Sequence, residues 1–249
     1  MARKKNRLSG EARPMVITPN YMKYAEGSCL IEAGDTKVIC TASVDYKVPP
    51  FLKDKGEGWL SAEYSMLPRS AQNRIPRDSV KGRINGRAQE IQRLIGRSLR
   101  SVINFSDFPD ITVLIDCDVI SADGGTRTAS ITGAYVAAYL AFLNLIKQGD
   151  IEKMPFYDSA AAISIGIVKG EILVDLDYSE DSVAELDFNF VLTGSGKIIE
   201  VQGCAEKTPI ELDMLTKLYE LSKSAVSKIT ELQQKAIDGV MPKFADRKF

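Results

Sequence analysis

A short polar stretch at residues 122–128, ADGGTRT, combines the residue types that hold an anion. Its two glycines let the backbone turn tightly with amide groups pointing inward. Thr126 supplies a hydroxyl, and Arg127 supplies a planar guanidinium that can bind two oxyanion oxygens at once. The stretch joins a strand-like run to a helix-like run, so a helix N-terminus would add partial positive charge. The alternative interpretation is a polar loop that caps the helix, with Arg127 paired to Asp123.

A second arginine favours the anion site. Arg87 lies near the start of a helix predicted over residues 84–103, at the flank of its apolar stripe. We expect Arg87 to face neighbouring elements, where it and Arg127 could converge on one phosphate. The opposite side of this helix carries arginines that fit a solvent-exposed face with salt bridges to Glu90, or an oligomer interface. They are Arg93, Arg97 and Arg100.

Six carboxylates between residues 175 and 187 form a third constellation. Strand alternation over 185–192 puts Glu185, Asp187 and Asn189 on one face, and Asp181 precedes that strand in a turn. A turn carboxylate and a strand carboxylate can share a Mg²⁺ ion, or one of them can act as a general acid. The competing interpretation is a charged and exposed strand face.

The composition narrows the chemistry further. The chain has no histidine, which excludes Ser-His-Asp and Cys-His catalysis and histidine metal sites. The net charge of −1 hides a separation: residues 69–100 carry nine Lys and Arg against two Asp and Glu, and residues 170–220 carry twelve Asp and Glu against three Lys. This distribution predicts a surface for a polyanion beside an acidic zone that binds cations or contacts the basic one. Arginines with a carboxylate-held metal indicate phosphoryl or nucleotidyl transfer, which needs no histidine.

Two rounds of β-hairpin and helix must position these groups, and they indicate an α+β fold that is consistent with an internal duplication. The first half is predicted to contain a hairpin over 28–44, a long irregular loop over 47–80, a strand over 111–120 and an apolar helix over 130–147. The second half is predicted to contain hairpins over 161–178 and 185–203, which turn at 169–170 and 194–196. A long helix is predicted to follow, with Thr208 as its N-cap and Pro209 at its first position.

Bulk properties set the class of protein. At 249 residues with 45% hydrophobic residues, the chain can bury a core as one large domain or two smaller ones. Three of its four cysteines lie in strand-like runs, which favours buried reduced thiols over a metal site. The basic N-terminus has no apolar segment behind it, and the apolar run 133–143 is shorter than the about 20 residues that a bilayer requires. We therefore expect a cytoplasmic protein that makes no contact with a membrane.

Four longer stretches closely resemble the bacterial ribonuclease PH family, and they cover nearly the whole chain in the right order. They are GEGWLSAEYSMLPRS, GRAQEIQRLIGRSLRSV, DCDVISADGGTRTASITGA and DLDYSEDSVAELDFN. The resemblance implies a phosphorolytic 3′→5′ exoribonuclease, also called a tRNA nucleotidyltransferase, which trims tRNA precursors with orthophosphate as co-substrate and releases nucleoside diphosphates. Other RNA 3′ ends, including those of rRNA, are further candidate substrates. The implied fold is a pair of βαβα-type units, like domain 2 of ribosomal protein S5, over residues 10–145 and 158–236.

The same resemblance implies roles for individual residues. Phosphate binding falls to Arg87, Gly125, Thr126 and Arg127, and the catalytic, Mg²⁺-linked pair is Asp181 and Asp187. The family assembles as a homo-hexameric ring, a trimer of dimers. Basic residues expected at ring contacts or on RNA are Arg69, Arg74, Arg77, Arg93 and Arg97.

Two other functions remain open at this point. One is a non-catalytic, RNA-binding ring subunit of an exosome-like assembly. Loss of Arg127 or Asp187 would favour that function, and both residues are present. The other is an unrelated Mg²⁺-dependent phosphotransferase that acts on a small substrate. RNA degradation with and without phosphate distinguishes all three functions.

Overall fold

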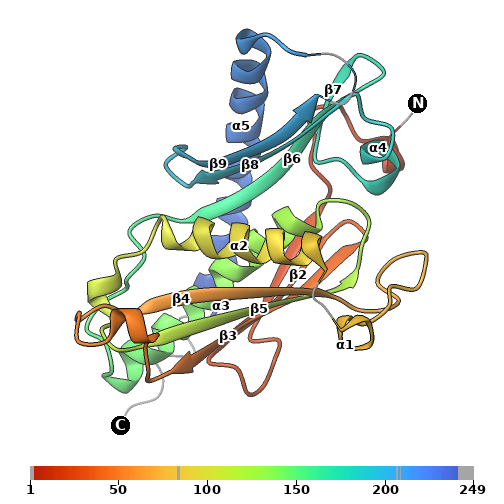
Figure 1. The fold of residues 1–249 in the computed structure, drawn as a ribbon. Coiled ribbons are helices and arrows are strands. Elements are labelled where there is room, and N and C mark those ends of the chain that lie inside the picture. The colour runs from red at the N-terminus through yellow and green to blue at the C-terminus, as the bar shows by residue number, and fades with distance from the viewer. Residues whose placement is uncertain (1–2, 83–84, 206, 208, 241–249) are drawn as a thin grey trace.

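The computed structural model describes residues 3–82, 85–205, 207 and 209–240. Its described strands form one five-stranded and one four-stranded sheet, with helices packed against both, which confirms the α+β class. Figure 1 shows the two sheets one above the other, with α2 lying between them and the long helix α5 rising behind the upper sheet. The predicted unit boundaries at 10–145 and 158–236 stay a prediction.

The first sheet has the strand order β1-β2-β3-β5-β4. Its strands are β1 (Met15–Pro19), β2 (Gly27–Ala33), β3 (Thr36–Asp45), β4 (Trp59–Met66) and β5 (Thr112–Ser121). The hairpin predicted over 28–44 and the strand predicted over 111–120 are confirmed by β2, β3 and β5. The irregular loop predicted over 47–80 is wrong in its middle, because β4 pairs in parallel with β5 there. Leu60 and Tyr64 of β4 are buried. Prolines and glycines lie on both sides of β4, so its alternation of buried and exposed residues was not recognised as a strand pattern.

Helices α2 (Gly86–Arg100) and α3 (Thr126–Gln148) pack against this sheet. Helix α2 confirms the amphipathic helix predicted there, with Ile91 and Ile95 fully buried. Helix α3 begins four residues earlier than predicted, directly after the left-handed Gly125. Helix α3 has 23 residues, and a window of 18 of them has a mean hydropathy of 1.6, which is long and apolar enough to span a membrane, so the sequence-based length argument is wrong. However, 78% of this apolar stretch is buried inside the protein, as in a core helix.

The second sheet has the order β7-β6-β8-β9. Its strands are β6 (Ala160–Val168), β7 (Glu171–Val174), β8 (Leu186–Thr193) and β9 (Ile198–Ala205). Both predicted hairpins are confirmed, and the first turns through the left-handed residues Lys169 and Gly170, as a two-residue hairpin requires. Helix α5 (Leu212–Asp238) begins after Glu211 rather than at Pro209. The predicted N-cap Thr208 lies outside the described residues.

A shared core joins the two sheets. Helix α3 contacts β2 and β3 on the first sheet and β6 on the second. The core around α3 therefore includes Ala160 and Ala162 of β6 together with the thiols of Cys29, Cys40 and Cys117, which confirms that three cysteines are buried. A second core lies between α5 and the other face of the upper sheet. The remaining short elements are η1 (Lys4–Asn6), η2 (Pro50–Leu52), α1 (Asp78–Lys81), η3 (Phe105–Asp107) and α4 (Tyr178–Asp181).

Candidate active site

The stretch ADGGTRT leads directly into α3 and presents the N-terminus of this helix. Gly124 and Gly125 have φ angles of 76° and 64°, a left-handed backbone that glycine adopts without strain. The turn also packs closely on the chain before α4, since a Cβ on Gly124 would lie 2.7 Å from the carbonyl oxygen of Leu176. The first backbone amides of a helix have no partner within the helix, so those of Thr126 and Arg127 can serve an anion.

A buried ion pair holds this turn in place. Arg13 Nη1 donates to the carbonyl oxygen of Asp123 at 2.6 Å, and the same guanidinium binds both carboxylate oxygens of Asp175 at 2.9 and 2.6 Å. The Thr36 hydroxyl accepts from the Asp123 amide at 2.9 Å and donates to the Gly124 carbonyl at 2.6 Å. Burial acts to lower the pKa of Arg13, but the hydrogen bond and charge of Asp175 together with the charges of Asp123 and Asp177 outweigh it, and the pKa is raised. The position of the turn therefore depends on side chains distant in sequence.

A hydroxyl pair lies at the first residue of α3. The Tyr64 hydroxyl of β4 donates to Thr126 Oγ1 at 2.9 Å, and both side chains are buried. Burial raises the pKa of Tyr64, while Arg87 and Arg127 act to lower it, so both arginines lie within electrostatic range of the phenol. No sequence pattern indicated a role for Tyr64, because β4 was predicted to be part of an irregular loop.

Arg127 extends from the first turn of α3 toward the second sheet. Its Nη1 donates to Gln202 Oε1 of β9 at 2.9 Å and lies 3.5 Å from Glu90 Oε1 of α2. The alternative pairing of Arg127 with Asp123 is wrong, because Asp123 binds Lys4 Nζ at 2.9 Å. Arg127 thus lies where α2, α3 and the second sheet meet. Gln202 is neutral and Glu90 is exposed to solvent, so an anion can replace both partners.

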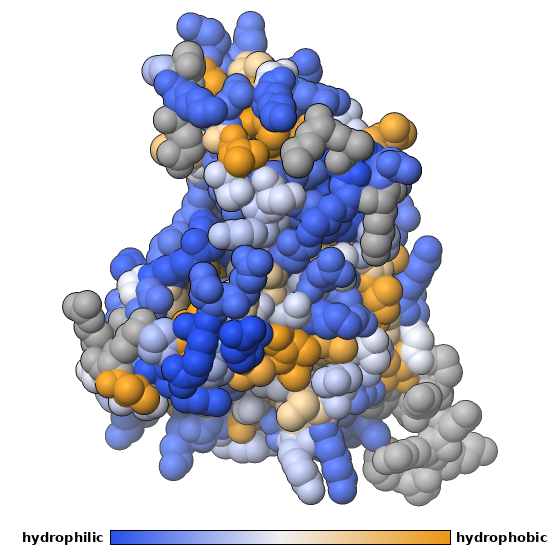
Figure 2. Space-filling view, turned by 90° about the vertical axis from the view of Figure 1, so that its right-hand side faces the viewer, coloured by the Kyte–Doolittle hydropathy of each residue, from blue (hydrophilic) through white to orange (hydrophobic). Residues whose placement is uncertain are grey.

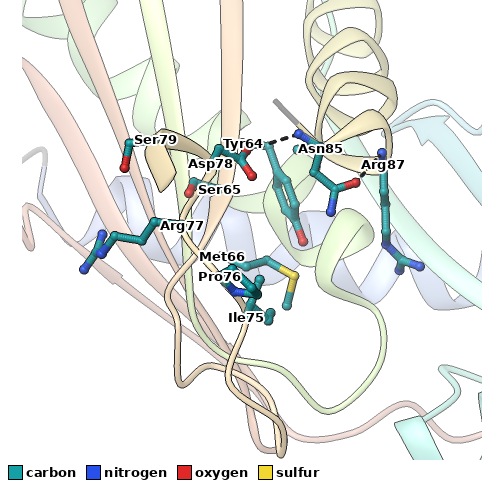
Figure 3. A pocket seen from close by; sticks show the side chains of 11 residues that line it. Tyr64, Ser65, Met66, Ile75, Pro76, Arg77, Asp78, Ser79, Asn85 and Arg87 are labelled. Atoms are coloured by element: carbon teal, nitrogen blue, oxygen red, sulfur yellow. Dashed lines mark hydrogen bonds between the residues drawn. The ribbon is translucent and has the colours of Figure 1, made fainter. Parts of the chain in front are cut away.

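Arg87 comes from the first turn of α2. Asn85 caps this helix by accepting a hydrogen bond from the Arg87 amide at 3.0 Å. The Arg87 side chain is exposed, and no described residue hydrogen-bonds to its guanidinium. Arg87 and Tyr64 line a cavity of about 440 Å³, and Figure 3 shows both side chains extending toward the same side of it. Other residues that line the cavity are Met66, Ile75, Pro76, Arg77 and Asn85.

Asp181 ends the one-turn helix α4, where the sequence predicted a turn. The surrounding protein desolvates its carboxyl group and raises the pKa of Asp181, while Arg87 and Arg127 act to lower it. The two arginines and this carboxylate therefore share one electrostatic neighbourhood, although they come from α2, α3 and α4. A carboxyl group whose pKa is perturbed beside cations in an open site is typical of functional sites.

Asp187 lies on β8, paired with Gly166 of β6 and Cys204 of β9. Two residues further along, Asn189 pairs with Gln202, so Asp187, Asn189 and Gln202 share one face of the sheet. Because Gln202 binds Arg127, this face is the one turned toward the start of α3. The set Arg87, Arg127, Asp181 and Asp187 is called the open cluster below.

A metal ion bound by protein groups alone does not fit these residues. Among the described residues, no group of three or more Asp, Glu, Cys or His could hold a metal ion. Two carboxylates are nevertheless sufficient for Mg²⁺, which keeps several waters and takes substrate phosphates as further ligands. Asp181 and Asp187 supply the oxygen donors that Mg²⁺ prefers. The donor set therefore fits a hydrated Mg²⁺ that is completed by a phosphorylated substrate.

Half of the acidic segment serves a different purpose. Arg3 Nε lies 2.7 Å from Glu180 Oε1, and Arg7 Nη2 lies 3.1 Å from Glu180 Oε2. Together with the pair Arg13–Asp175, these contacts bury three arginines against the acidic segment. The sequence analysis missed them, although the spacing of three arginines ahead of β1 was visible. The set Arg3, Arg7, Arg13, Asp175, Asp177 and Glu180 is called the closed cluster below.

The basic residues expected at ring contacts or on RNA lie on the surface. Arg69, Arg74 and Arg77 are exposed in the chain between β4 and α1, and Arg93 is exposed on α2. Arg97 lies 2.6 Å from Glu200 of β9, so the salt bridge of this helix face runs to the second sheet rather than to Glu90. The expected exposed face of α2 is wrong for Arg100, which is half-buried, donates to the Leu60 carbonyl oxygen at 3.0 Å and lies over the ring of Trp59. Figure 2 shows that the side of the molecule carrying α1 and α4 is largely hydrophilic and narrows between the two sheets.

Comparison with known proteins places this architecture among RNA-degrading enzymes. Residues 11–143 match the model of the 3′ exoribonuclease family, domain 1, and residues 158–225 match that of domain 2. The chain is 49% identical over 240 residues to "Ribonuclease PH" of Moorella thermoacetica, covering 96% of each chain. It is 51% identical over 232 residues to "Ribonuclease PH" of Neisseria meningitidis, covering 93% of this chain and 96% of that one.

Solved structures share the fold at low sequence identity. Rice (Oryza sativa) Rrp46 superposes with a TM-score of 0.76 at 17% identity, covering 94% of this chain and 100% of that chain. A chain of the Archaeoglobus fulgidus exosome with RNA bound to the active site superposes with a TM-score of 0.76 at 21% identity, covering 92% of this chain and 91% of that chain. These likenesses confirm the fold expected from the sequence.

Proposed function

The chain belongs to the ribonuclease PH family of 3′ exoribonucleases, and from this membership we propose that its open cluster performs phosphorolysis of RNA 3′ ends, with tRNA precursors as the main substrates. The enzyme is a phosphate-dependent 3′→5′ exoribonuclease, that is, a nucleotidyltransferase. The alternative of a non-catalytic ring subunit is less supported, because the relatives at about half identity carry the enzyme's name.

The reaction exchanges one phosphorus–oxygen bond for another. An oxygen of orthophosphate attacks the phosphorus of the last phosphodiester, and the bond from that phosphorus to the 3′ oxygen of the preceding nucleotide breaks. The terminal nucleotide leaves as a nucleoside diphosphate, and the shortened RNA gains a proton on its new 3′ oxygen. Both reactants are anions, so the site must offset their repulsion before they can meet.

The open cluster has the parts for this task. Arg87 and Arg127 offer two guanidinium groups to orthophosphate, and Thr126 and the amides at the start of α3 add donors to the same anion. Gly125 supplies left-handed backbone to the turn before α3, and the absence of a side chain leaves room for Arg13, since a Cβ there would lie 2.8 Å from Arg13 Nη2. The raised pKa of Asp181 suits a group that exchanges a proton with the phosphate or with the leaving oxygen.

We further propose that Asp181 and Asp187 hold Mg²⁺ together with substrate phosphates. When bound, the ion would screen the negative charge that gathers on the phosphorus oxygens in the transition state. Asp187 shares a face of the second sheet with Gln202, the partner of Arg127, so a substrate held by the two carboxylates would lie beside Arg127.

Oligomerisation and RNA binding are assigned to the exposed basic surface. We propose that the chain forms a homo-hexamer, a trimer of dimers, with Arg69, Arg74 and Arg77 at ring contacts or on RNA. One related structure is titled an archaeal exosome core, with a TM-score of 0.69, and this supports an oligomer as a property of the fold. Exposed arginines that have no partner among the described residues suit either role.

The convergence of Arg87, Arg127 and Asp181 from separate elements is the single observation that supports this function best. It is tested with a short 3′-labelled RNA, Mg²⁺ and the purified protein, with and without orthophosphate. We expect shortening only with phosphate, and nucleoside diphosphates as the product. Nucleoside monophosphates released without phosphate would mean that water is the attacking group, and the proposal would then be wrong.

A further inference from the structure

The hydroxyl pair Tyr64–Thr126 lies at the anion-binding end of α3 and has no role so far. Tyr64 is 4% exposed and Thr126 is 7% exposed, so bulk water does not compete for their hydrogen bond. The phenol donates to Thr126 Oγ1 at 2.9 Å. A threonine hydroxyl has one proton and two lone pairs. Because one lone pair accepts from Tyr64, the Thr126 proton must point away from the phenol and toward another acceptor.

The position of Thr126 determines which acceptor can receive that proton. Thr126 is the first residue of α3, directly after the left-handed Gly125 and directly before Arg127. The free amides of the helix N-terminus surround the same point. An anion held there by Arg127 and Arg87 is the acceptor that this arrangement provides.

The phenol retains the proton that it donates to Thr126. Burial raises the pKa of Tyr64, and the two arginines do not reverse this shift, so the phenol stays protonated at neutral pH. Tyr135 of α3 provides a contrast. It is also buried, but it packs in the aromatic cluster with Tyr139 and Phe156. Tyr135 is therefore a matched control for removal of a buried phenolic hydroxyl.

We propose that Tyr64 is a positioning residue for orthophosphate, which acts by directing the Thr126 proton at the anion bound between Arg87 and Arg127. The inference rests on the proposed function, since it assigns a further residue to the same phosphate site. Tyr64 does not itself touch the phosphate. Its hydroxyl fixes one donor in advance, so the donor need not be reoriented when phosphate binds.

The test is a double-mutant cycle on the full-length protein, built from Tyr64→Phe, Thr126→Val and the double variant. Initial rates are measured over a range of phosphate concentrations at saturating RNA, and over a range of RNA concentrations at saturating phosphate. We expect Tyr64→Phe to raise the KM for phosphate by about 5- to 10-fold, the size of one hydrogen bond, with kcat and the KM for RNA almost unchanged. In the double variant, loss of the Tyr64 hydroxyl should add nothing to the effect of Thr126→Val.

Controls separate this inference from folding and from the proposed function. Tyr135→Phe should leave the KM for phosphate unchanged, and thermal unfolding reports whether each variant is folded at the assay temperature. If Arg127→Ala raises the KM for phosphate and Tyr64→Phe does not, the positioning role is wrong and the phosphate site stands. An additive effect of Tyr64→Phe in the Thr126→Val background also overturns the role. If the wild-type protein degrades RNA without phosphate, the proposed function itself fails.

Discussion

The closed and open clusters are built from the same residue types, and one acidic segment contributes to both. In the closed cluster, Arg3, Arg7 and Arg13 are buried and bind Asp175 and Glu180 at hydrogen-bond distance. In the open cluster, the guanidinium of Arg87 has no hydrogen-bond partner among the described residues, and Arg127 binds an amide oxygen and an exposed carboxylate. The two clusters differ in the partners of their arginines rather than in composition.

This difference in partners distinguishes arginines that stabilise the fold from arginines that can bind a ligand. A buried arginine with matched carboxylates satisfies its own donors, so it stabilises one conformation and has no capacity left for a ligand. An arginine near solvent with weak or no partners keeps its donors for an incoming anion. The closed cluster also supports the open one, because Arg13 fixes the turn that presents the start of α3. Mutations in the two clusters should therefore affect different measurements.

The largest effect is expected for Asp187→Asn in the open cluster. This change keeps the shape of the side chain and removes its charge, so turnover should fall by about 10³-fold or more, over 4 kcal/mol in the transition state. RNA affinity and the unfolding midpoint should stay close to the wild-type values. Single-turnover rates and gel-shift binding measure the two quantities, with the exposed Asp213→Asn of α5 as the control. Near-normal turnover at low Mg²⁺ would assign Asp187 to a solvated strand face.

The next effect is expected for Asp175→Asn in the closed cluster, and it should appear in stability. The change leaves the buried guanidinium of Arg13 without its charged partner, which costs about 3–5 kcal/mol. Urea unfolding followed by circular dichroism measures the loss. Glu171→Gln, an exposed carboxylate of β7, should change stability by less than about 0.5 kcal/mol. A loss of similar size in both variants would mean that the closed cluster is not a specific stabiliser.

A smaller effect, confined to phosphate, is expected for Arg127→Ala. Loss of a charge-assisted hydrogen bond of about 1.5–3 kcal/mol should raise the phosphate requirement by about 10- to 100-fold while RNA still binds. The phosphate dependence of the rate measures this effect, and Lys228→Ala on the exposed face of α5 is the control for loss of a positive charge. Equal weakening of phosphate and RNA would indicate a general electrostatic role instead.

The smallest effect is on the pH dependence of the free energy of unfolding, and its sign should differ between the two clusters. Burial acts to raise the pKa of Asp177, but hydrogen bonds from Ser179 and Glu180 outweigh it and leave the pKa lowered. Asp177 therefore stabilises the fold above the ordinary pKa of about 3.9, and this contribution is lost as pH falls through its folded-state pKa. The pKa of Asp181 is raised, so its charged form opposes folding at neutral pH.

Two variants isolate these signs. Asp177→Asn should lower the free energy of unfolding at pH 7, and Asp181→Asn should raise it while it reduces activity. The Asp181→Asn difference should shrink as the pH falls through the raised folded-state pKa of Asp181 to the ordinary value of about 3.9. The Asp177→Asn difference should shrink only below that value, as the pH falls through the lowered folded-state pKa of Asp177. Urea unfolding at several pH values measures them. The same sign for both variants at pH 7 would contradict the division into a closed and an open cluster.

Sequence patterns predicted most elements of this fold because these elements carry strong local signals. The apolar spacing of Ile91 and Ile95 identified α2, and the pair Lys169–Gly170 identified a hairpin turn. Strand β4 was missed because only Leu60 and Tyr64 are deeply buried in it. An edge strand that pairs in parallel has no hairpin partner to reveal it.

The candidate site was predictable in its residue types and not in its contacts. The types and local settings of Arg87, Arg127 and Asp187 were visible in the chain. Which carboxylate meets which arginine depends on tertiary packing, so the pattern of residues alone could not separate Asp175 and Glu180 from Asp181, and only the family resemblance singled out Asp181. Gln202 as the partner of Arg127 was equally hidden, because no local pattern links α3 to β9. The roles of the open-cluster residues stay predictions until the variants are measured.

Helix α3 has a consequence for how the protein is made. The ribosome completes residues 126–148 before it synthesises β6 (Ala160–Val168), the strand of the second sheet that covers part of this helix. At about 5–20 residues per second, the nascent chain carries an incompletely covered apolar helix for on the order of a second or more. Chaperones and the membrane-insertion machinery bind exposed apolar segments of this kind. The start of α3, which we propose to bind phosphate, is thus also the start of an apolar segment that is exposed during synthesis.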